Sequence, residues 1–200
     1  AACSESEEGK GQPTEKEGTE EARSTGIKSP EAPYAVLETF NVGKGVYVRS
    51  MALEAERDAL WIGTTTGVLE IGLDDRKMRN TFTREDGLAN GYVFGIGVDD
   101  QGYKWFGTNG GGLSRYRDGE WKTFFPKDGL ADYWVYSFAE TEDGKLWVGT
   151  WDGANRVDLA TQHFTTFKKE LINEWVYGLE VDREGRVWFG TEGGISMLED

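Results

Sequence analysis

The chain has 200 residues, of which 38% are hydrophobic and 13% aromatic, so it is long and apolar enough to bury a sizeable core. Its formal net charge of -14 repels phosphate backbones, which argues against nucleic acid as a partner. A single cysteine, Cys3, excludes a disulfide framework and a zinc site of the multi-cysteine kind.

Residues 1–33 are built mainly of Glu, Ser, Thr, Gly, Lys and Pro and carry almost no large apolar side chain. Such a composition buries too little apolar surface to offset the entropy lost on ordering. We therefore expect a disordered acidic tether over 1–33 and the folded part over 34–200. The tether holds eight acids and four bases, which leaves a net charge of -10 on the folded part.

Cys3 stands in the tripeptide Ala-Ala-Cys and precedes a small polar residue. This sequence resembles the end of a bacterial lipoprotein signal, in which the cysteine is acylated. The alternative is a free thiol on a disordered segment. No apolar run approaches the ~20 residues that a spanning helix requires, so the lipid is the only membrane attachment we expect. The predicted location is the cell envelope, on the periplasmic or extracellular side.

The first candidate strand is "YAVLETF" at 34–40, and a repeated motif follows it. Trp-x-Gly-Thr occurs at Trp61, Trp105, Trp147 and Trp188, at intervals of 44, 42 and 41 residues. A period of this length is typical of repeat architectures. The second copy predicts strands at 93–98, 103–108, 113–117 and 121–125, and the third predicts strands at 135–141, 145–150, 154–159 and 163–167. Four short strands joined by tight turns, without a helical period, predict a β-propeller blade.

Three copies share the wording "DDQGYKWFGTNGGGLSRY", "TEDGKLWVGTWDGANRV" and "DREGRVWFGTEGGISML", whereas the first, "EAERDALWIGT", lacks the glycine turn. The pattern resembles the two-component regulator propeller repeat, which occurs in sensor regions of bacterial hybrid signalling proteins and in secreted or lipid-anchored relatives. The resemblance extends over 34–200 and implies an all-β propeller with four four-stranded blades. Two interpretations stay open: a ring of four blades closed by the strand at 34–40, or, as we favour, part of a larger ring of about seven blades.

The repeated motif itself is explained by architecture. Its tryptophans are expected to fill the space between blades, its glycines (Gly63, Gly107, Gly149 and Gly190) to allow close backbone approach, and its threonines to bond the following turn. The lone histidine, His163, is expected on a solvated outer hairpin. No phosphate loop, serine elbow or metal-spaced cluster is present in the sequence. We therefore predict no catalytic residue, no metal site and no cofactor.

Aromatic residues recur where each copy's first strand begins. These strands read "YVRSM", "YVFGI", "WVYSF" and "WVYGL", and the turn after the second strand begins near the same face. The predicted ligand-binding residues are Tyr47, Arg49, Tyr92, Phe94, Trp134, Tyr136, Trp151, Trp175 and Tyr177. Rings converging on one face can bind a sugar or another planar group. They can equally plug a channel and pack between blades, but the polar residues that vary from copy to copy favour binding.

The sequence thus predicts a non-catalytic ligand-binding or sensor propeller that takes a small molecule or carbohydrate. Two alternatives remain: a lyase or hydrolase whose catalytic residues lie on further blades, and a scaffold that binds a protein partner. A histidine or paired carboxylates in the channel would favour the enzyme.

Overall fold

The computed structural model of the protein describes residues 35–199. The chain divides between Phe40 and Asn41 into two units. In the first unit, residues 35–40 carry no secondary structure, and the second unit holds all fifteen strands of the described residues. The predicted tether at 1–33, with Cys3, lies outside the described residues.

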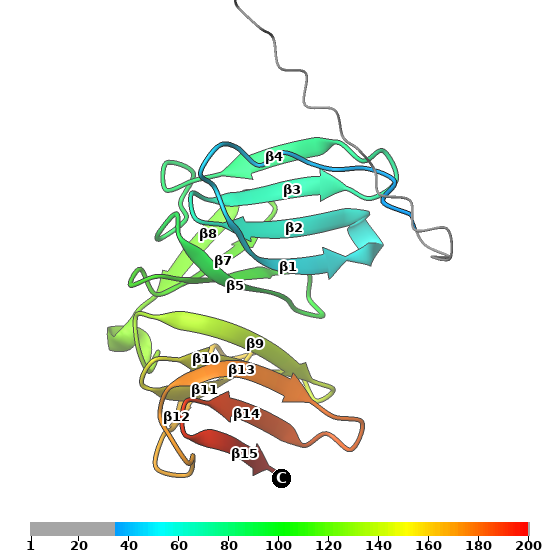
Figure 1. The fold of residues 1–200 in the computed structure, drawn as a ribbon. Helices are drawn as coiled ribbons and strands as arrows, with labels where there is room; N and C mark the ends of the chain where they lie inside the picture. The colour runs from blue at the N-terminus through cyan, green and yellow to red at the C-terminus, as the bar shows by residue number, and fades with distance from the viewer. Residues whose placement is uncertain (1–34, 200) are drawn as a thin grey trace, which may run out of the picture. The chain divides into compact units, whose positions relative to one another are not determined.

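The strands form separate antiparallel sheets in which neighbours in the chain are neighbours in space (Figure 1). The first sheet contains β1 (Val48–Glu54), β2 (Ala59–Thr64), β3 (Val68–Gly72) and β4 (Met78–Phe82). The second contains β5 (Val93–Val98), β6 (Lys104–Thr108), β7 (Leu113–Arg117) and β8 (Glu120–Phe124). The third contains β9 (Val135–Thr141), β10 (Lys145–Thr150), β11 (Gly153–Asp158) and β12 (His163–Phe167). The fourth contains β13 (Val176–Val181), β14 (Val187–Thr191) and β15 (Gly194–Leu198).

These sheets confirm the predicted propeller blades, with two corrections. The fourth blade has three strands in the described residues, not four. The strand expected at 34–40 is absent from 35–40, and Tyr34 lies outside the described residues. A strand needs a partner edge for its backbone groups, and no ladder of the described residues includes this segment. Its apolar side chains stay exposed, at 83% for Val36 and 86% for Leu37.

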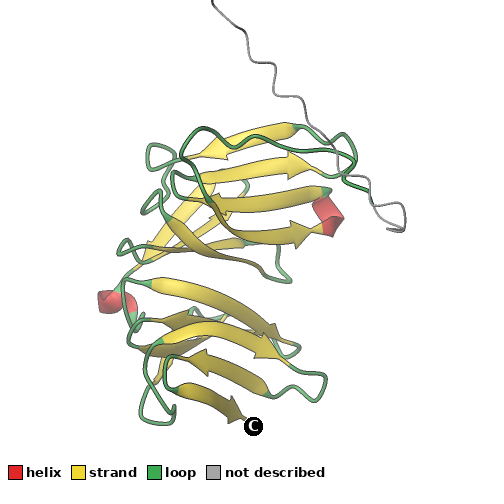
Figure 2. Cartoon of the chain, in the orientation of Figure 1, coloured by secondary structure: helices red, strands yellow, loops and turns green. Residues whose placement is uncertain are grey.

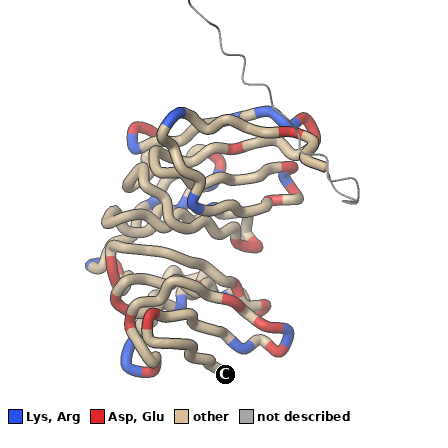
Figure 3. The backbone as a smooth tube through the Cα atoms, viewed as in Figure 1, with Lys and Arg blue, Asp and Glu red and all other residues tan. Residues whose placement is uncertain are grey.

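Apart from the strands, the regular structure of the described residues consists of two short 3-10 turns, η1 (Ala55–Arg57) and η2 (Pro126–Asp128) (Figure 2). Acidic and basic residues alternate along the chain without long runs of one sign (Figure 3). Within 35–199, no helix has the length and apolar character needed to cross a membrane.

The sheets pack on one another through the strands that begin them. β1 contacts β5, β5 contacts β9, and β9 contacts β13, so we call these four the inner strands. Apolar clusters join each sheet to the next, for example Trp61 of β2 with Val93 of β5 and Phe106 of β6. The motif tryptophans Trp61, Trp105 and Trp147 are 3%, 0% and 2% exposed, as expected of core residues. Trp188 in the fourth sheet is 38% exposed, so the expectation that it fills the space between blades is wrong for this copy.

The rest of the motif fixes the turn that follows it. Each threonine hydroxyl donates to a carbonyl across the turn, and the four bonds, of 2.7 to 2.9 Å, are Thr64 to Gly67, Thr108 to Gly112, Thr150 to Gly153 and Thr191 to Gly194. The glycine before the threonine allows close approach between sheets. A Cβ on Gly107 would lie 2.6 Å from the carbonyl oxygen of Val135 in the next sheet. The expectation for the threonines is therefore confirmed in all four copies. The expectation for the glycines is confirmed at Gly107 but not at Gly190, where a Cβ would meet nothing nearer than 3.7 Å.

Candidate ligand-binding site

A side-chain oxygen fixes the entry to three of the four inner strands. The backbone N–H of the residue just before the strand donates to the side chain two positions upstream: Tyr92 to Asn90 at 2.9 Å, Trp134 to Asp132 at 2.8 Å, and Trp175 to Asn173 at 2.8 Å. Short polar side chains that bond the backbone two residues on set a local turn. The backbone of these aromatic residues at the strand entries, which we call the entry aromatics, is thus fixed by side chains only two residues away.

A second link ties each entry residue to the turn that follows the second strand of its sheet. The carbonyls of Tyr47, Tyr92, Trp134 and Trp175 accept from the backbone N–H groups of Thr65, Asn109, Trp151 and Glu192, at 3.0 to 3.2 Å. This bond recurs in all four sheets. The expected meeting of strand entry and turn on one face is therefore confirmed.

A β-bulge follows the first valine of every inner strand. In β5, Val93 pairs with Thr108 and Gly95 pairs with Gly107, so Phe94 has no partner in the ladder. The equivalent unpaired residues in β1, β9 and β13 are Arg49, Tyr136 and Tyr177. A bulge re-aims the side chain of its extra residue. Arg49 and Phe94 contact the ring of the entry residue Tyr92, and Tyr136 contacts the rings of Phe94 and Tyr177.

Seven of the nine predicted residues form one connected series of rings, which we call the aromatic row. Its members are Tyr92, Phe94, Trp134, Tyr136, Trp151, Trp175 and Tyr177. Phe94 lies 4.9 Å from Tyr136 between ring centroids, which joins the second sheet to the third. Tyr136 lies 5.1 Å from Tyr177, which joins the third to the fourth. Trp151 stacks on Trp175 at 4.2 Å.

The aromatic row is partly open to solvent, with Trp134, Trp151 and Tyr177 exposed at 42%, 36% and 44%. Arg49 lies at its end, with the guanidinium carbon 5.8 Å from the ring centroids of both Tyr92 and Phe94. Tyr47 is 68% exposed, and within the described residues no ring contact joins it to the row. The structure therefore brings eight of the nine predicted residues together and leaves Tyr47 beside them.

Tyr136 occupies the middle of the aromatic row. Its pKa is raised to about 12, mainly by burial and to a smaller extent by the neighbouring Tyr177 and Asp132. The phenol is consequently neutral at physiological pH and can donate a hydrogen bond to a ligand oxygen.

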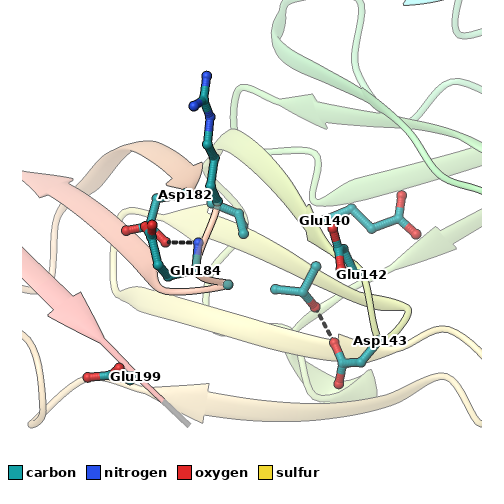
Figure 4. A pocket seen from close by; sticks show the side chains of 10 residues that line it. Glu140, Glu142, Asp143, Asp182, Glu184 and Glu199 are labelled. Carbon is teal, nitrogen blue, oxygen red and sulfur yellow. Dashed lines mark hydrogen bonds between the residues drawn. The ribbon is translucent and has the colours of Figure 1, made fainter.

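A separate hollow of about 630 Å³ lies at the opposite ends of two inner strands, between the β9–β10 and β13–β14 turns (Figure 4). Its acidic side chains are Glu140, Glu142, Asp143, Asp182, Glu184 and Glu199. The pKa of Glu140 is raised to about 7, mainly by burial and to a smaller extent by the Asp100 and Asp99 carboxylates. Within 35–199, no group of three such side chains is placed to hold a metal ion. The hollow is thus lined by acidic side chains together with Arg183, and no aromatic ring lines it.

Sequence reasoning missed the side chains that position the entry aromatics. These side chains lie three residues before the first valine of the inner strand, at Asn90, Asp132 and Asn173. The signal was present as "NGYV", "DYWV" and "NEWV", in which an Asn or Asp precedes the aromatic by two.

Comparison with known proteins supports the repeat assignment. The family model described as "Two component regulator propeller" matches residues 129–152 and 170–193. No curated protein matches the chain.

Among solved structures, the chain is similar to the extracellular domain of a protein described as a hybrid two component system from B. thetaiotaomicron. The identity is 28% over 76% of this chain and 21% of the other, with a TM-score of 0.70. An extracellular domain described as a one component system from the same organism matches at 22% identity over 75% and 27%, with a TM-score of 0.55. Virginiamycin B lyase from Staphylococcus aureus matches at 17% identity over 76% and 55%, with a TM-score of 0.57. The chain thus spans 21 to 55% of the length of these proteins.

Proposed function

The chain carries two-component regulator propeller repeats, and from this premise we propose that it is a non-catalytic, sensor-type propeller that binds a ligand on its aromatic row. The ligand is a small molecule or glycan with rings that stack on the exposed tryptophans. The observation that carries the proposal is the connected row itself. Seven rings from three sheets meet on one face, and turn bonds and bulges that recur in every sheet hold them there.

The position of the row favours binding over simple packing. The buried motif tryptophans already fill the spaces between the sheets, so the row is additional to the core. Trp151 illustrates the difference, because it sits on a turn and remains 36% exposed although it contacts three other rings. A stacked aromatic pair that faces solvent offers a flat apolar surface next to hydrogen-bonding groups.

The experiment compares two exposed aromatics of one region by measuring ligand binding to a panel of glycans and small ring compounds. Trp151→Ala removes a ring that contacts three others of the row and should weaken binding by about tenfold or more, because stacking on an aromatic contributes about 1 to 3 kcal/mol. Tyr133→Ala is the matched control. Tyr133 is 46% exposed and adjoins Trp134, but its ring contacts Phe125 at 6.2 Å and lies outside the row.

Unfolding measurements on the same variants separate binding from packing. A ligand-binding Trp151 can be removed with little change in the free energy of unfolding. A loss of about 3 to 5 kcal/mol in the Trp151→Ala variant, with no ligand found for the wild type, would show that the row is a packing element and would refute the proposal.

A lyase is the competing function, because virginiamycin B lyase shares the fold. A variant of that enzyme in which a histidine is replaced by alanine is described as catalytically inactive. The single histidine of this chain, His163, is exposed on β12, the strand of its sheet farthest from inner strand β9. It lies outside the aromatic row, so the described residues favour binding over lyase chemistry.

We further propose that the protein faces the outside of the cytoplasm and is anchored by lipid on Cys3. The two B. thetaiotaomicron neighbours are extracellular domains, and the Ala-Ala-Cys sequence supplies an acylation site. Expression of the complete gene with Cys3→Ala should move the protein from the membrane fraction to the soluble envelope fraction. A Cys3→Ala protein that stays with the membrane would rule out the anchor.

A further inference from the structure

The bulge position of the first inner strand differs chemically from the other three. Phe94, Tyr136 and Tyr177 contribute rings to the aromatic row, whereas the equivalent residue of β1 is Arg49. It is exposed, and no ion pair joins it to a carboxylate of residues 35–199. The first blade therefore brings a cation to the place where every other blade brings an aromatic ring.

The guanidinium of Arg49 is already in contact with the row. Its central carbon is 5.8 Å from the ring centroids of both Tyr92 and Phe94, within the range of a cation–π interaction. A planar guanidinium can stack on an aromatic face and still direct its N–H groups at a carboxylate. Tyr92 and Phe94 thus hold the group at the edge of the surface that a stacked ligand would cover.

The opposite end of the row has the opposite charge. Lys168 forms an ion pair with Asp152, and Asp132 and Glu174 lie close enough to raise the pKa of Lys168 as well. One ammonium therefore faces an excess of carboxylates in the part of the chain that holds Trp151 and Trp175. An anionic group would be repelled there, and the net charge of -14 on the chain adds to this repulsion. A negative ligand group has its favourable position at the Arg49 end.

We propose that Arg49 is a specificity-determining residue that selects ring ligands carrying an anionic substituent, such as oligosaccharides that contain a uronic acid. The inference rests on the proposed function of the row. The ligand's rings stack on the row, and its carboxylate accepts hydrogen bonds from Arg49 beside Tyr92 and Phe94. The acidic end excludes the reversed orientation.

The test uses neutral oligosaccharides together with uronic acid oligosaccharides, each of the latter in its free and its methyl-esterified form. Esterification removes the charge and keeps the rings. The wild type should bind the free acids about tenfold or more tightly than their esters, since a hydrogen bond to a charged group contributes on that scale. Arg49→Gln should abolish this preference, and Arg49→Lys should restore part of it.

Arg183→Gln is the matched control, because Arg183 is also exposed but lies in the turn at the far end of inner strand β13. It removes the same charge and should leave the preference intact. Equal binding of acids and esters by the wild type would overturn the inference and leave the proposed function standing. So would an equal loss of acids and esters in Arg49→Gln, since Arg49 would then act by packing alone. Binding of none of these oligosaccharides would overturn the inference and the glycan form of the proposed function together.

Discussion

Trp105 in the second sheet and Trp188 in the fourth occupy the same position of the repeat in different surroundings. Each donates from its indole N–H to an aspartate six residues upstream at 2.8 Å, Trp105 to Asp99 and Trp188 to Asp182. Yet Trp105 is 0% exposed and Trp188 is 38% exposed. The hydrogen bond is the same in these two sheets, whereas burial comes from the neighbouring sheet that covers Trp105.

The same contrast runs through the third strands. Val68, Leu113 and Ala154 are 0% exposed, and the equivalent Ile195 of β15 is 71% exposed. One sheet therefore forms its ladder and turn by itself, but its apolar face gains its stabilisation from the sheet that follows. Stability in this protein should concentrate at the junctions between sheets.

The strongest test of this contrast removes the tryptophan from each setting. Trp105→Ala should lower the free energy of unfolding by about 3 to 5 kcal/mol, because it leaves a cavity between two packed sheets. Trp188→Ala should cost about 1 to 2 kcal/mol, because its side chain is only partly withdrawn from water. Urea denaturation of both variants measures the difference. Equal losses would mean that packing within each sheet, not the junction, stabilises the tryptophan.

A smaller effect is expected from the motif glycines. A Cβ on Gly107 would lie 2.6 Å from the carbonyl oxygen and 2.7 Å from Cγ1 of Val135, so Gly107→Ala should cost about 1 to 3 kcal/mol through displaced backbone. A Cβ on Gly190 would meet nothing nearer than 3.7 Å, and Gly190→Ala should change stability by less than about 0.5 kcal/mol. Thermal unfolding of the two variants measures the difference. A destabilised Gly190→Ala with an unaffected Gly107→Ala would reverse the assignment of covered and open sheets.

The last effect concerns pH at the junction of the second and third sheets. The Glu140 carboxylate accepts from the backbone N–H of Asp100 at 3.1 Å, and burial raises its pKa from 4.5 to about 7. Between these values the folded state binds more protons than the unfolded state. The stabilisation that comes from the protonated Glu140 carboxyl is therefore fully present below about pH 4.5 and is lost as pH rises through about 7.

Glu140→Gln should remove that part of the pH dependence, as measured by denaturant midpoints from pH 4 to 8. Glu142→Gln, in the exposed neighbouring turn, removes the same charge and serves as the control. An unchanged pH profile in Glu140→Gln would show that Glu140 does not titrate in this range.

The sequence predicted most strands well because their boundaries are set locally. Turn glycines and the Trp-x-Gly-Thr motif delimit strands such as 93–98 and 135–141, which the structure reproduces exactly as β5 and β9. The strand predicted at 34–40 is absent from 35–40, because an apolar segment forms a strand only when the edge of another strand pairs with its backbone groups. The exposure of Trp188 could not be predicted from the sequence either, because its motif is the same as that of the buried tryptophans.

For the candidate site, alignment of the four copies identified the residues, but it did not predict the β-bulge at which Arg49 and Phe94 lie. Pattern alone placed Arg49 and Phe94 one position after a valine. The orientation of these two side chains depends on a register shift between paired strands. The sequence of one strand alone does not reveal such a shift. The function of these residues as ligand contacts stays a prediction.

The bulge also divides the residues of a duplicated blade into those that pair in the ladder and one that does not. The ladder residues on either side meet defined partners and vary little, with valine before the bulge in all four blades and Ser or Gly after it. The unpaired residue between them is free of that constraint, and the four blades hold Arg, Phe, Tyr and Tyr there. Duplication can therefore multiply contact positions while point mutation alters each of them singly, so that a new ligand preference needs no new fold.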